Sequence, residues 1–269
     1  MERDFLKEYY DLHRKDAVAM ERLTASPYVM NVYGYCGQTA INEFAHFMEG
    51  YSDFEDFAKR VRGKNGKSFM FVKLQIATMI ALGLNDIHDV GDNGYATMVH
   101  YDINPKNIEL TKSGFPKIND FNVAEFLGWN ERTGKPCGFK GRFREPWWRS
   151  PEEMIRGDDQ PVLDEKVDVY ALGNVLYTLL TGHSPRGRST EDRINTVRKE
   201  LIHGNPPPMS SFFKNSKDPM ISAMRESISL CLEPDPKKRA SSREVATYLF
   251  NEFQRIKATM GNLLNPDKS

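Results

Sequence analysis

Apolar residues recur at helical spacing near the N-terminus, and a strand-like pattern follows. Between residues 11 and 23 they fall on one helical face, at Leu12, Ala17, Met20 and Leu23, and the residues TASP end the pattern. The stretches YVMNVYGYCG and INEFAHFME are rich in β-branched and aromatic residues and flank a Gly-Gln turn. The pattern predicts one helix followed by a β-hairpin.

The rest of the chain has mainly helical patterns. GYSDFEDFAKR begins a short helix, and FMFVKLQIATMIALGLNDIH places Ile76, Ile80 and Leu84 on one face. Four more helices are predicted over KVDVYALGNVLYTLLTG, which is apolar nearly all round and therefore buried, DRINTVRKELIHG, MISAMRESISLCL and SSREVATYLFNEF. The last opens with Ser241 and Glu244 at the spacing of a capping box.

Two segments between these helices are not helical. IELTKSGFPKIND is predicted to form two short strands around a Ser-Gly turn. Residues 122–150 show no periodicity and contain glycine, proline and many charged residues. We expect a long functional loop there.

Composition narrows the function classes. The chain has 269 residues, enough for one large domain or two joined lobes, and its 37 acidic and 37 basic residues give no net charge that would indicate a nucleic-acid partner. Three widely spaced cysteines, Cys36, Cys137 and Cys231, fit reduced thiols in a reducing compartment. The charged N-terminus and the apolar stretches shorter than about 20 residues predict no signal peptide, no membrane span and a cytoplasmic location.

The stretch VHYDINPKNIEL concentrates the candidate chemistry. His100, Asp102 and Asn107 lie in a short polar turn between apolar residues, and Asp120 follows after the predicted hairpin. This order suits phosphoryl transfer, because one carboxylate can accept a hydroxyl proton while the amide and the second carboxylate hold magnesium against phosphates.

The motifs resemble those of protein kinases. HYDINPKN resembles their catalytic loop, DFN at Asp120 their magnesium-binding DFG, and SPE at Ser150 their APE. DVYALG from Asp168 resembles the start of the buried kinase helix, and DPKKRAS carries Arg239. Five motifs in order cover essentially residues 10–255. WWRSPE is similar to the tryptophan-bearing motif of tyrosine kinases and tyrosine-kinase-like serine/threonine kinases, so we expect that branch.

The resemblance implies an α+β, two-lobed fold with a truncated small β lobe and a large, mainly helical C-lobe. Residues 1–50 would form the partial N-lobe, residues 51–258 the C-lobe and residues 259–269 a tail. ATP and Mg²⁺ would be the cofactors. A protein substrate and a regulatory protein would be the partners.

The resemblance also implies roles for single residues in catalysis. Asp102 would be the catalytic base, and Asn107 and Asp120 the metal ligands. Asn104 belongs to the same catalytic loop but replaces the lysine that serine/threonine kinases aim at the transferred phosphate. Lys106 is displaced by two positions.

Other residues would have structural or nucleotide-binding roles. Asp168 would brace the catalytic loop, His100 and Phe121 would join the regulatory hydrophobic stack, and Glu152 would pair with Arg239. Taken one by one, His100 and Phe121 also suit an ordinary core and Asp168 a helix cap. The adenine-binding hinge would lie at His46 to Met48, with Ala45 as a small gatekeeper.

Several parts of the kinase pattern are missing. The chain starts too late for a Gly-rich loop and a third-strand lysine, which we expect to lie upstream, and Lys7 is too close in sequence to replace that lysine. The acid that would pair with it falls on Asp16 if the TASP loop has one extra residue, and on Ala17 otherwise. Helix periodicity favours Asp16.

Replacements within the motifs change regulation and nucleotide binding. Tyr101 replaces the arginine that receives an activation-loop phosphate, and Thr133 is the clearest acceptor, so we expect no activation by phosphorylation there. Asn122 stands where DFG has glycine, a mild change if a positive φ is required. Glu109 falls beneath the expected adenine ring, where an unpaired carboxylate is costly to desolvate. With the phosphate contacts missing, we expect these residues alone to bind Mg-ATP at about millimolar affinity or weaker.

Three functions remain open. We favour an ATP-dependent serine/threonine kinase, with tyrosine the less favoured acceptor. A pseudokinase that acts as a scaffold or allosteric module is the alternative, supported by Asn104, Glu109 and the missing phosphate loop. A small-molecule phosphotransferase is less favoured, because such enzymes do not usually carry the motifs of a protein-substrate platform.

Overall fold

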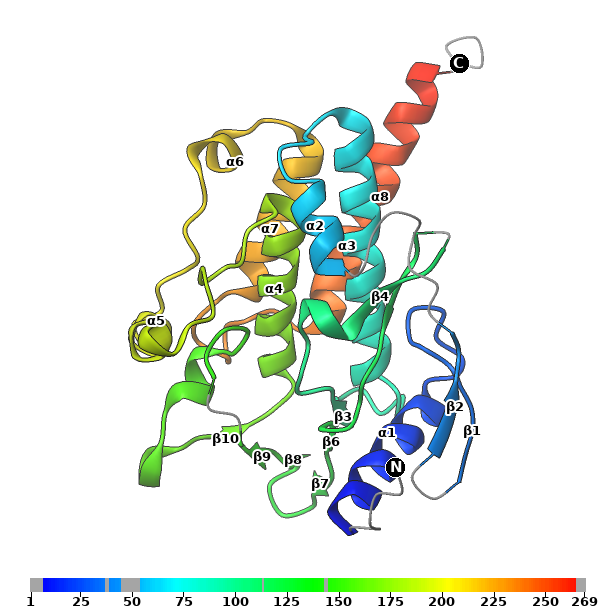
Figure 1. The fold of residues 1–269 in the computed structure, drawn as a ribbon, viewed down its shortest axis with the longest axis vertical. Coiled ribbons are helices and arrows are strands. Elements are labelled where there is room, and N and C mark those ends of the chain that lie inside the picture. The colour runs from blue at the N-terminus through cyan, green and yellow to red at the C-terminus, as the bar shows by residue number, and fades with distance from the viewer. Residues whose placement is uncertain (1–6, 37–38, 45–53, 113, 143–144, 265–269) are drawn as a thin grey trace.

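The computed structural model describes residues 7–36, 39–44, 54–112, 114–142 and 145–264. The chain opens with helix α1 (Lys7–Arg22) and an antiparallel hairpin of β1 (Val32–Cys36) and β2 (Thr39–Asn42). Both predicted elements are therefore present, and the hairpin is shorter than the apolar pattern suggested. Figure 1 shows α1 and the hairpin side by side at one edge of the molecule.

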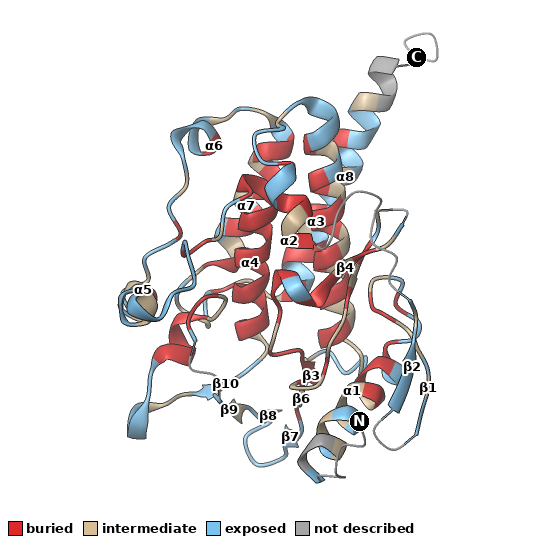
Figure 2. Ribbon diagram, in the orientation of Figure 1, coloured by how far each residue is buried: buried red, intermediate tan, exposed pale blue. Residues whose placement is uncertain are grey.

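A helical body forms most of the structure. Its helices are α2 (Phe54–Arg60), α3 (Lys67–His88), α4 (Lys166–Thr181), α5 (Ile194–Ile202), α6 (Ser211–Asn215), α7 (Pro219–Cys231) and α8 (Ser242–Leu264). Helix α3 packs against α8, and α4 packs against α7. Figure 2 shows that α4 is buried along its whole length, as its apolar sequence predicts.

Helix α8 begins at the predicted capping box. Glu244 Oε2 accepts from Ser241 N at 2.7 Å, and Glu244 N donates to Ser241 Oγ at 3.2 Å. The helix continues to Leu264, so the expected boundary between C-lobe and tail, after residue 258, falls inside it.

Helix α3 is long and apolar enough to cross a membrane by length and composition alone. In the fold, 56% of its most apolar stretch is buried inside the protein, and it contacts α4, α7 and α8. Its buried lysine, Lys73, donates to the carbonyl of Leu180 at 3.0 Å, and burial lowers the pKa of this amine to about 8. These contacts identify α3 as a core helix.

Short strands surround the polar stretch of residues 100–107. β3 (Met98–Val99) leads into it, and the 3₁₀ turn η1 (Pro105–Asn107) and the hairpin of β4 (Ile108–Leu110) and β5 (Pro116–Ile118) follow, as predicted. Tyr28 and Met30 form backbone hydrogen bonds with Ile118, so the N-terminal part is joined to this hairpin.

The long loop of residues 122–150 is not featureless, which corrects the expectation from its composition. It contains β6 (Glu125–Phe126), β7 (Trp129–Asn130), β8 (Lys135–Pro136) and β9 (Phe139–Lys140). β6 pairs with β3, β7 with β8, and β9 with β10 (Val162–Leu163). The sheets formed by the described residues have two strands each.

The 3₁₀ turns η2 (Pro151–Met154), η3 (Gly157–Asp159) and η4 (Glu191–Arg193) lie after the long loop.

The three cysteines are free thiols, as expected. Cys36 and Cys137 are exposed, and Cys231 is buried in the helical core. Burial raises the pKa of the Cys231 thiol.

Candidate active site

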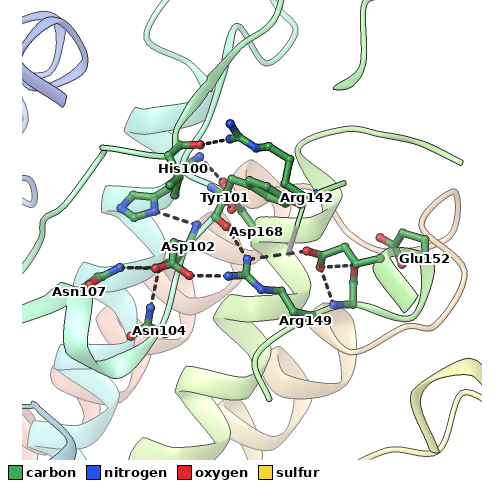
Figure 3. A network of polar contacts seen from close by, with 12 residues as sticks. His100, Tyr101, Asp102, Asn104, Asn107, Arg142, Arg149, Glu152 and Asp168 are labelled. Atoms are coloured by element: carbon green, nitrogen blue, oxygen red, sulfur yellow. Dashed lines mark hydrogen bonds and ion pairs between the residues drawn. The ribbon is translucent and has the colours of Figure 1, made fainter. Parts of the chain in front are cut away.

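Asp168, at the start of α4, fixes the backbone of the polar loop (Figure 3). Its Oδ2 accepts from His100 N at 2.6 Å and its Oδ1 from Tyr101 N at 2.8 Å. His88 Nε2 lies 3.1 Å from the same carboxylate, which is 1% exposed. Tyr101 has φ of 65°, a conformation that costs energy in a non-glycine residue and that these hydrogen bonds stabilise. Asp168 therefore makes the contacts that a brace of the loop requires.

Asp102 and Asn107 face each other within the loop. Asn107 Nδ2 donates to the Asp102 carbonyl at 2.8 Å and to Asp102 Oδ2 at 3.1 Å. Because the amide nitrogen is used in this way, the amide oxygen of Asn107 is the atom that can bind a cation.

Asn104 is occupied with the loop's own backbone. Its Oδ1 accepts from Lys106 N at 2.9 Å, and its Nδ2 donates to the Asp102 carbonyl at 2.9 Å. It thereby caps η1 and ties Asp102 to the turn that follows it.

His100 and Phe121 connect the loop to the DFN motif. Their rings are 4.6 Å apart and both side chains are fully buried. On the other side, Asp16 Oδ1 of α1 accepts from Phe121 N at 2.7 Å, whereas Ala17 lies in the core. Burial raises the pKa of Asp16, the hydrogen bond from Phe121 opposes this, and the charge of Asp120 adds to it. The carboxylate of Asp16 thus reaches the DFN backbone.

The left-handed residue of DFN is Asp120, with φ of 65°. Asn122 is not among the non-glycine residues with positive φ. The glycine position of the motif therefore places no special demand on the asparagine, and the expected strain lies two residues earlier.

Asn107 and Asp120 suit a magnesium site that shares its ion with phosphates. Mg²⁺ prefers oxygen ligands and usually binds to one or two carboxylates together with water and substrate phosphates. Within the described residues no group of three or more His, Cys, Asp or Glu side chains could hold a metal ion. The remaining ligands would have to come from the nucleotide and water.

Arg149 contacts Asp102 from the far end of the long loop, and the sequence analysis gave it no role. Its Nη2 lies 2.6 Å from Asp102 Oδ1, and its Nη1 donates to the Tyr101 carbonyl (Figure 3). The guanidinium is only 12% exposed. The one signal in the sequence is a cation directly before SPE, at a position that follows two tryptophans.

Glu153 lies behind Arg149. Its Oε2 accepts from Ser150 N and Ser150 Oγ, both at 2.7 Å, and its Oε1 lies 3.7 Å from Arg149 Nη1. Burial raises the pKa of Glu153 to about 7, although the charge of Arg149 and the hydrogen bonds of Ser150 oppose the shift.

Tyr101 fastens the long loop to the polar loop of residues 100–107. Its buried hydroxyl accepts from Arg142 N at 2.8 Å, and its ring meets that of Phe139 edge to face at 4.7 Å. Arg142 in turn donates to the Val123 carbonyl at 2.9 Å and pairs with Glu125. This part of the loop is held without a phosphate group.

Glu152 and Arg239 form the pair that the family resemblance implied. Arg239 Nη1 donates to Glu152 Oε1 at 2.7 Å and Nη2 to Oε2 at 3.0 Å. The guanidinium also donates to the carbonyls of Glu233, Pro234 and Lys166. Arg239 is 2% exposed, so this is a buried, fully hydrogen-bonded ion pair.

The expected nucleotide side is only partly described. Ala45, His46 and Met48 lie outside the described residues. Glu109 is half-buried on β4, directly opposite Lys117 of β5, and Lys117 Nζ lies 2.6 Å from Glu43 Oε2. Glu109 therefore lies opposite a lysine in the ladder, and the amine of that lysine pairs with Glu43.

In a comparison with known protein families, the sequence matches one family model. Residues 6–250 match the model of the protein kinase domain. The chain is 25% identical over 261 residues to the MAP kinase kinase skh1/pek1 of Schizosaccharomyces pombe and 29% identical over 171 residues to the serine/threonine-protein kinase dst2 of Dictyostelium discoideum. It is 26% identical over 217 residues to the human serine/threonine-protein kinase tousled-like 2.

Each of these alignments covers a larger share of this chain than of the relative's own length. They include 91%, 63% and 76% of the chain, in that order. They span 63%, 14% and 27% of the relatives' own lengths. The similarity therefore concerns the kinase domain of these proteins.

Proposed function

This chain belongs to the protein kinase family, and we propose that it transfers the γ-phosphate of ATP to a serine or threonine hydroxyl of a protein. The similar proteins named above include serine/threonine-protein kinases. We further propose a two-lobed arrangement with a small N-terminal lobe, and membership of the tyrosine-kinase-like branch on the basis of WWRSPE. A cytoplasmic location is part of the same proposal and rests on composition.

The observation that carries the proposal is the setting of Asp102. Asn107 donates to one oxygen of its carboxylate and Arg149 to the other, and Asp168 fixes the backbone on which it stands. A base held in this way can accept the proton of a substrate hydroxyl as the hydroxyl attacks phosphorus. An aspartate in an ordinary polar turn would not need Asn107, Arg149 and Asp168 as partners.

Asn107 and Asp120 would hold Mg²⁺ in this proposal. The ion, when bound, would balance the charge of the ATP phosphates. The chain's own part is to hold the Asn107 amide against Asp102, and to fix Phe121, the neighbour of Asp120, through the hydrogen bond to Asp16.

Arg149 would supply the positive charge that Asn104 lacks. The resemblance to serine/threonine kinases implies a lysine at the position of Asn104, and here the Asn104 side chain caps η1. The guanidinium of Arg149 reaches the Asp102 carboxylate from another element, at 2.6 Å. Its fixed cation would steady Asp102 and stabilise the charge of the phosphate in transfer.

A pseudokinase is the second candidate. The 269 residues contain no Gly-rich motif, and Arg149 already occupies one oxygen of Asp102. In a pseudokinase the same contacts would only stabilise the structure of a binding module, and no phosphate would be transferred.

Phosphate transfer separates the two candidates. Both the 269-residue chain and the product of the longest natural reading frame that contains it are incubated with labelled Mg-ATP and a mixture of protein substrates. A kinase loses transfer by about 100-fold or more in Asp102→Asn, the size expected for a lost general base, while its melting temperature is unchanged. Binding of ATP by both products without Asp102-dependent transfer would favour the pseudokinase.

A further inference from the structure

An open cleft of about 770 Å³ lies beside Asp102. Its walls are the polar loop, the end of α2 with the residues that follow it, the loop after α4 and the segment of residues 145–149. Trp147 and Trp148 line it together with these segments. A chain lying in the cleft would bring a hydroxyl to the Asp102 carboxylate.

The lining carries more positive than negative charge. Its cations are Lys59, Arg62, Lys106, Arg149 and Arg188. Its carboxylates are Glu55, Asp102 and Glu145.

Two of these carboxylates are already neutralised within the fold. Glu55 pairs with Lys59 at 2.8 Å, and Asp102 pairs with Arg149 at 2.6 Å. Glu145 is the acid that remains to face the other cations of the cleft.

Arg62, Lys106 and Arg188 are exposed, and none of them forms an ion pair within the described part of the chain. They come from three different segments, so the positive charge is spread around the cleft. Gly182 fixes one side of it: its φ is 69°, and a Cβ there would lie 2.5 Å from Arg62 Cβ. This close approach joins the residues after α2 to the end of α4.

We propose that this cleft selects protein segments whose acceptor hydroxyl is flanked by acidic side chains, either carboxylates or phosphates. The proposal rests on the proposed function, because it takes the acceptor to lie at Asp102. Three cations that form no ion pair with any described residue, in an open cleft, attract negative charge and repel lysine and arginine. Each would contribute a contact typical of an exposed ion pair, and together they set the sequence preference.

A protein segment fits this cleft better than a nucleic acid. The whole chain has equal numbers of acidic and basic residues, which gives no long-range attraction for a polyanion. The cleft is also lined by the Asp102 carboxylate, which the proposed function takes to receive a hydroxyl proton.

The test measures binding without nucleotide, so that it does not depend on phosphate transfer. Four fluorescent peptides of equal length share a central serine, which is flanked by Asp and Glu, by phosphoserine, by Lys and Arg, or by Gly and Ala. Anisotropy titrations use the 269-residue chain, the Arg62→Ala, Lys106→Ala and Arg188→Ala variants and their triple combination. Lys257→Ala, which removes an exposed cation on α8 away from the cleft, is the charge-matched control.

We expect an acidic peptide to bind at least about tenfold more tightly than the Gly and Ala peptide, and the Lys and Arg peptide to bind least. Each single cleft variant should weaken acidic binding by about two- to fivefold and the triple variant by about tenfold or more. Lys257→Ala should leave it unchanged. The phosphoserine and Asp/Glu peptides distinguish the two sources of charge, and preference for either supports the proposal.

Equal affinity for acidic and neutral peptides, binding of none of them, or an equal effect of Lys257→Ala would overturn it. So would a single-stranded oligonucleotide that binds more tightly than both acidic peptides. Acidic preference in a chain that transfers no phosphate would refute the proposed function alone. Transfer without acidic preference would refute only this inference.

Discussion

The helical body buries its apolar residues, whereas the N-terminal hairpin exposes several of its own. Along α4 every residue from Val167 to Thr181 is buried. On the hairpin and just beyond it, Tyr33 is 70% exposed, Ile41 65% and Phe44 76%. The body therefore supplies the rigid support for Asp102, whereas the β1–β2 hairpin contributes little buried area to it.

The two regions also differ in how they hold the candidate site. From α4 and from the end of the long loop, Asp168 and Arg149 make direct hydrogen bonds to the polar loop of residues 100–107. From the N-terminal region, the described contact to the DFN motif is the one from Asp16 to Phe121. The polar loop is therefore held mainly by α4 and by the end of the long loop, and we expect its stability to respond mainly to changes there.

The largest expected effect is on the buried ion pair of the body. Arg239→Ala leaves Glu152 buried without its partner and should lower the free energy of unfolding by about 3 to 5 kcal/mol. The measurement is thermal or denaturant unfolding. Arg243→Ala is the matched control, because its pair with Asp89 is exposed and worth about 1 kcal/mol or less. Equal effects of the two substitutions would show that burial of the pair does not matter.

A change of pH tests the turn η2, which holds both Glu152 and Glu153. Burial raises the pKa of Glu153 to about 7, so between about pH 4.5 and 7 the folded chain holds a proton that the unfolded chain has lost. The contribution of this group to stability therefore falls as pH rises through that window, by about 3 kcal/mol in total.

Glu153→Gln removes this titration. The stability of the variant relative to the original chain should increase between pH 5 and pH 8, as measured by urea unfolding at both values. A difference between the two proteins that is the same at both pH values would contradict the raised pKa.

The same substitution at a buried and at an exposed isoleucine compares the core with the β1–β2 hairpin. Ile118 of β5 is 1% exposed and Ile41 of β2 is 65% exposed. Ile118→Thr should cost at least about 2 kcal/mol, because it removes buried apolar atoms and buries a hydroxyl. Ile41→Thr, which keeps the β-branched shape, should change stability by less than about 0.5 kcal/mol. A large cost at Ile41 would show that the hairpin is coupled to the body.

The smallest expected effect is on the exposed turn between β7 and β8. Thr133 lies there and takes no part in the contacts of Tyr101 with Arg142 and Phe139, which fasten the loop without phosphate. Thr133→Ala should leave both stability and any transfer activity unchanged in unfolding and transfer assays. A large loss of activity would mean that this loop depends on phosphorylation at Thr133.

Local motifs in the sequence predicted much of the site. Asp102, Asn104 and Asn107 belong to one turn, so their proximity follows from spacing alone, and the structure brings Asn107 against Asp102. The hairpin of β4 and β5, the core helix α4 and the capping box of α8 also follow from short-range patterns. The pairing of Glu152 with Arg239 came from the family resemblance, because 87 residues separate them.

Contacts made by the long loop could not be predicted. Arg149 is 47 residues from Asp102, and the path between them has no periodic pattern. The left-handed conformation at Asp120 rather than Asn122 depends on hydrogen bonds to distant elements, such as that from Phe121 to Asp16. Tertiary contacts, not local preference, decided these features.

A comparison of transfer rates tests most directly whether Arg149, at the end of the long loop, positions the proposed catalytic base Asp102. Arg149→Ala, Arg149→Lys and the double variant Arg149→Ala with Asn104→Lys are compared in the longest natural reading frame that contains these residues. We predict that kcat falls by about 100-fold in Arg149→Ala. We also predict that it recovers in part in the other two variants, each of which returns a cation to Asp102. An unchanged or higher kcat in Arg149→Ala would contradict the account.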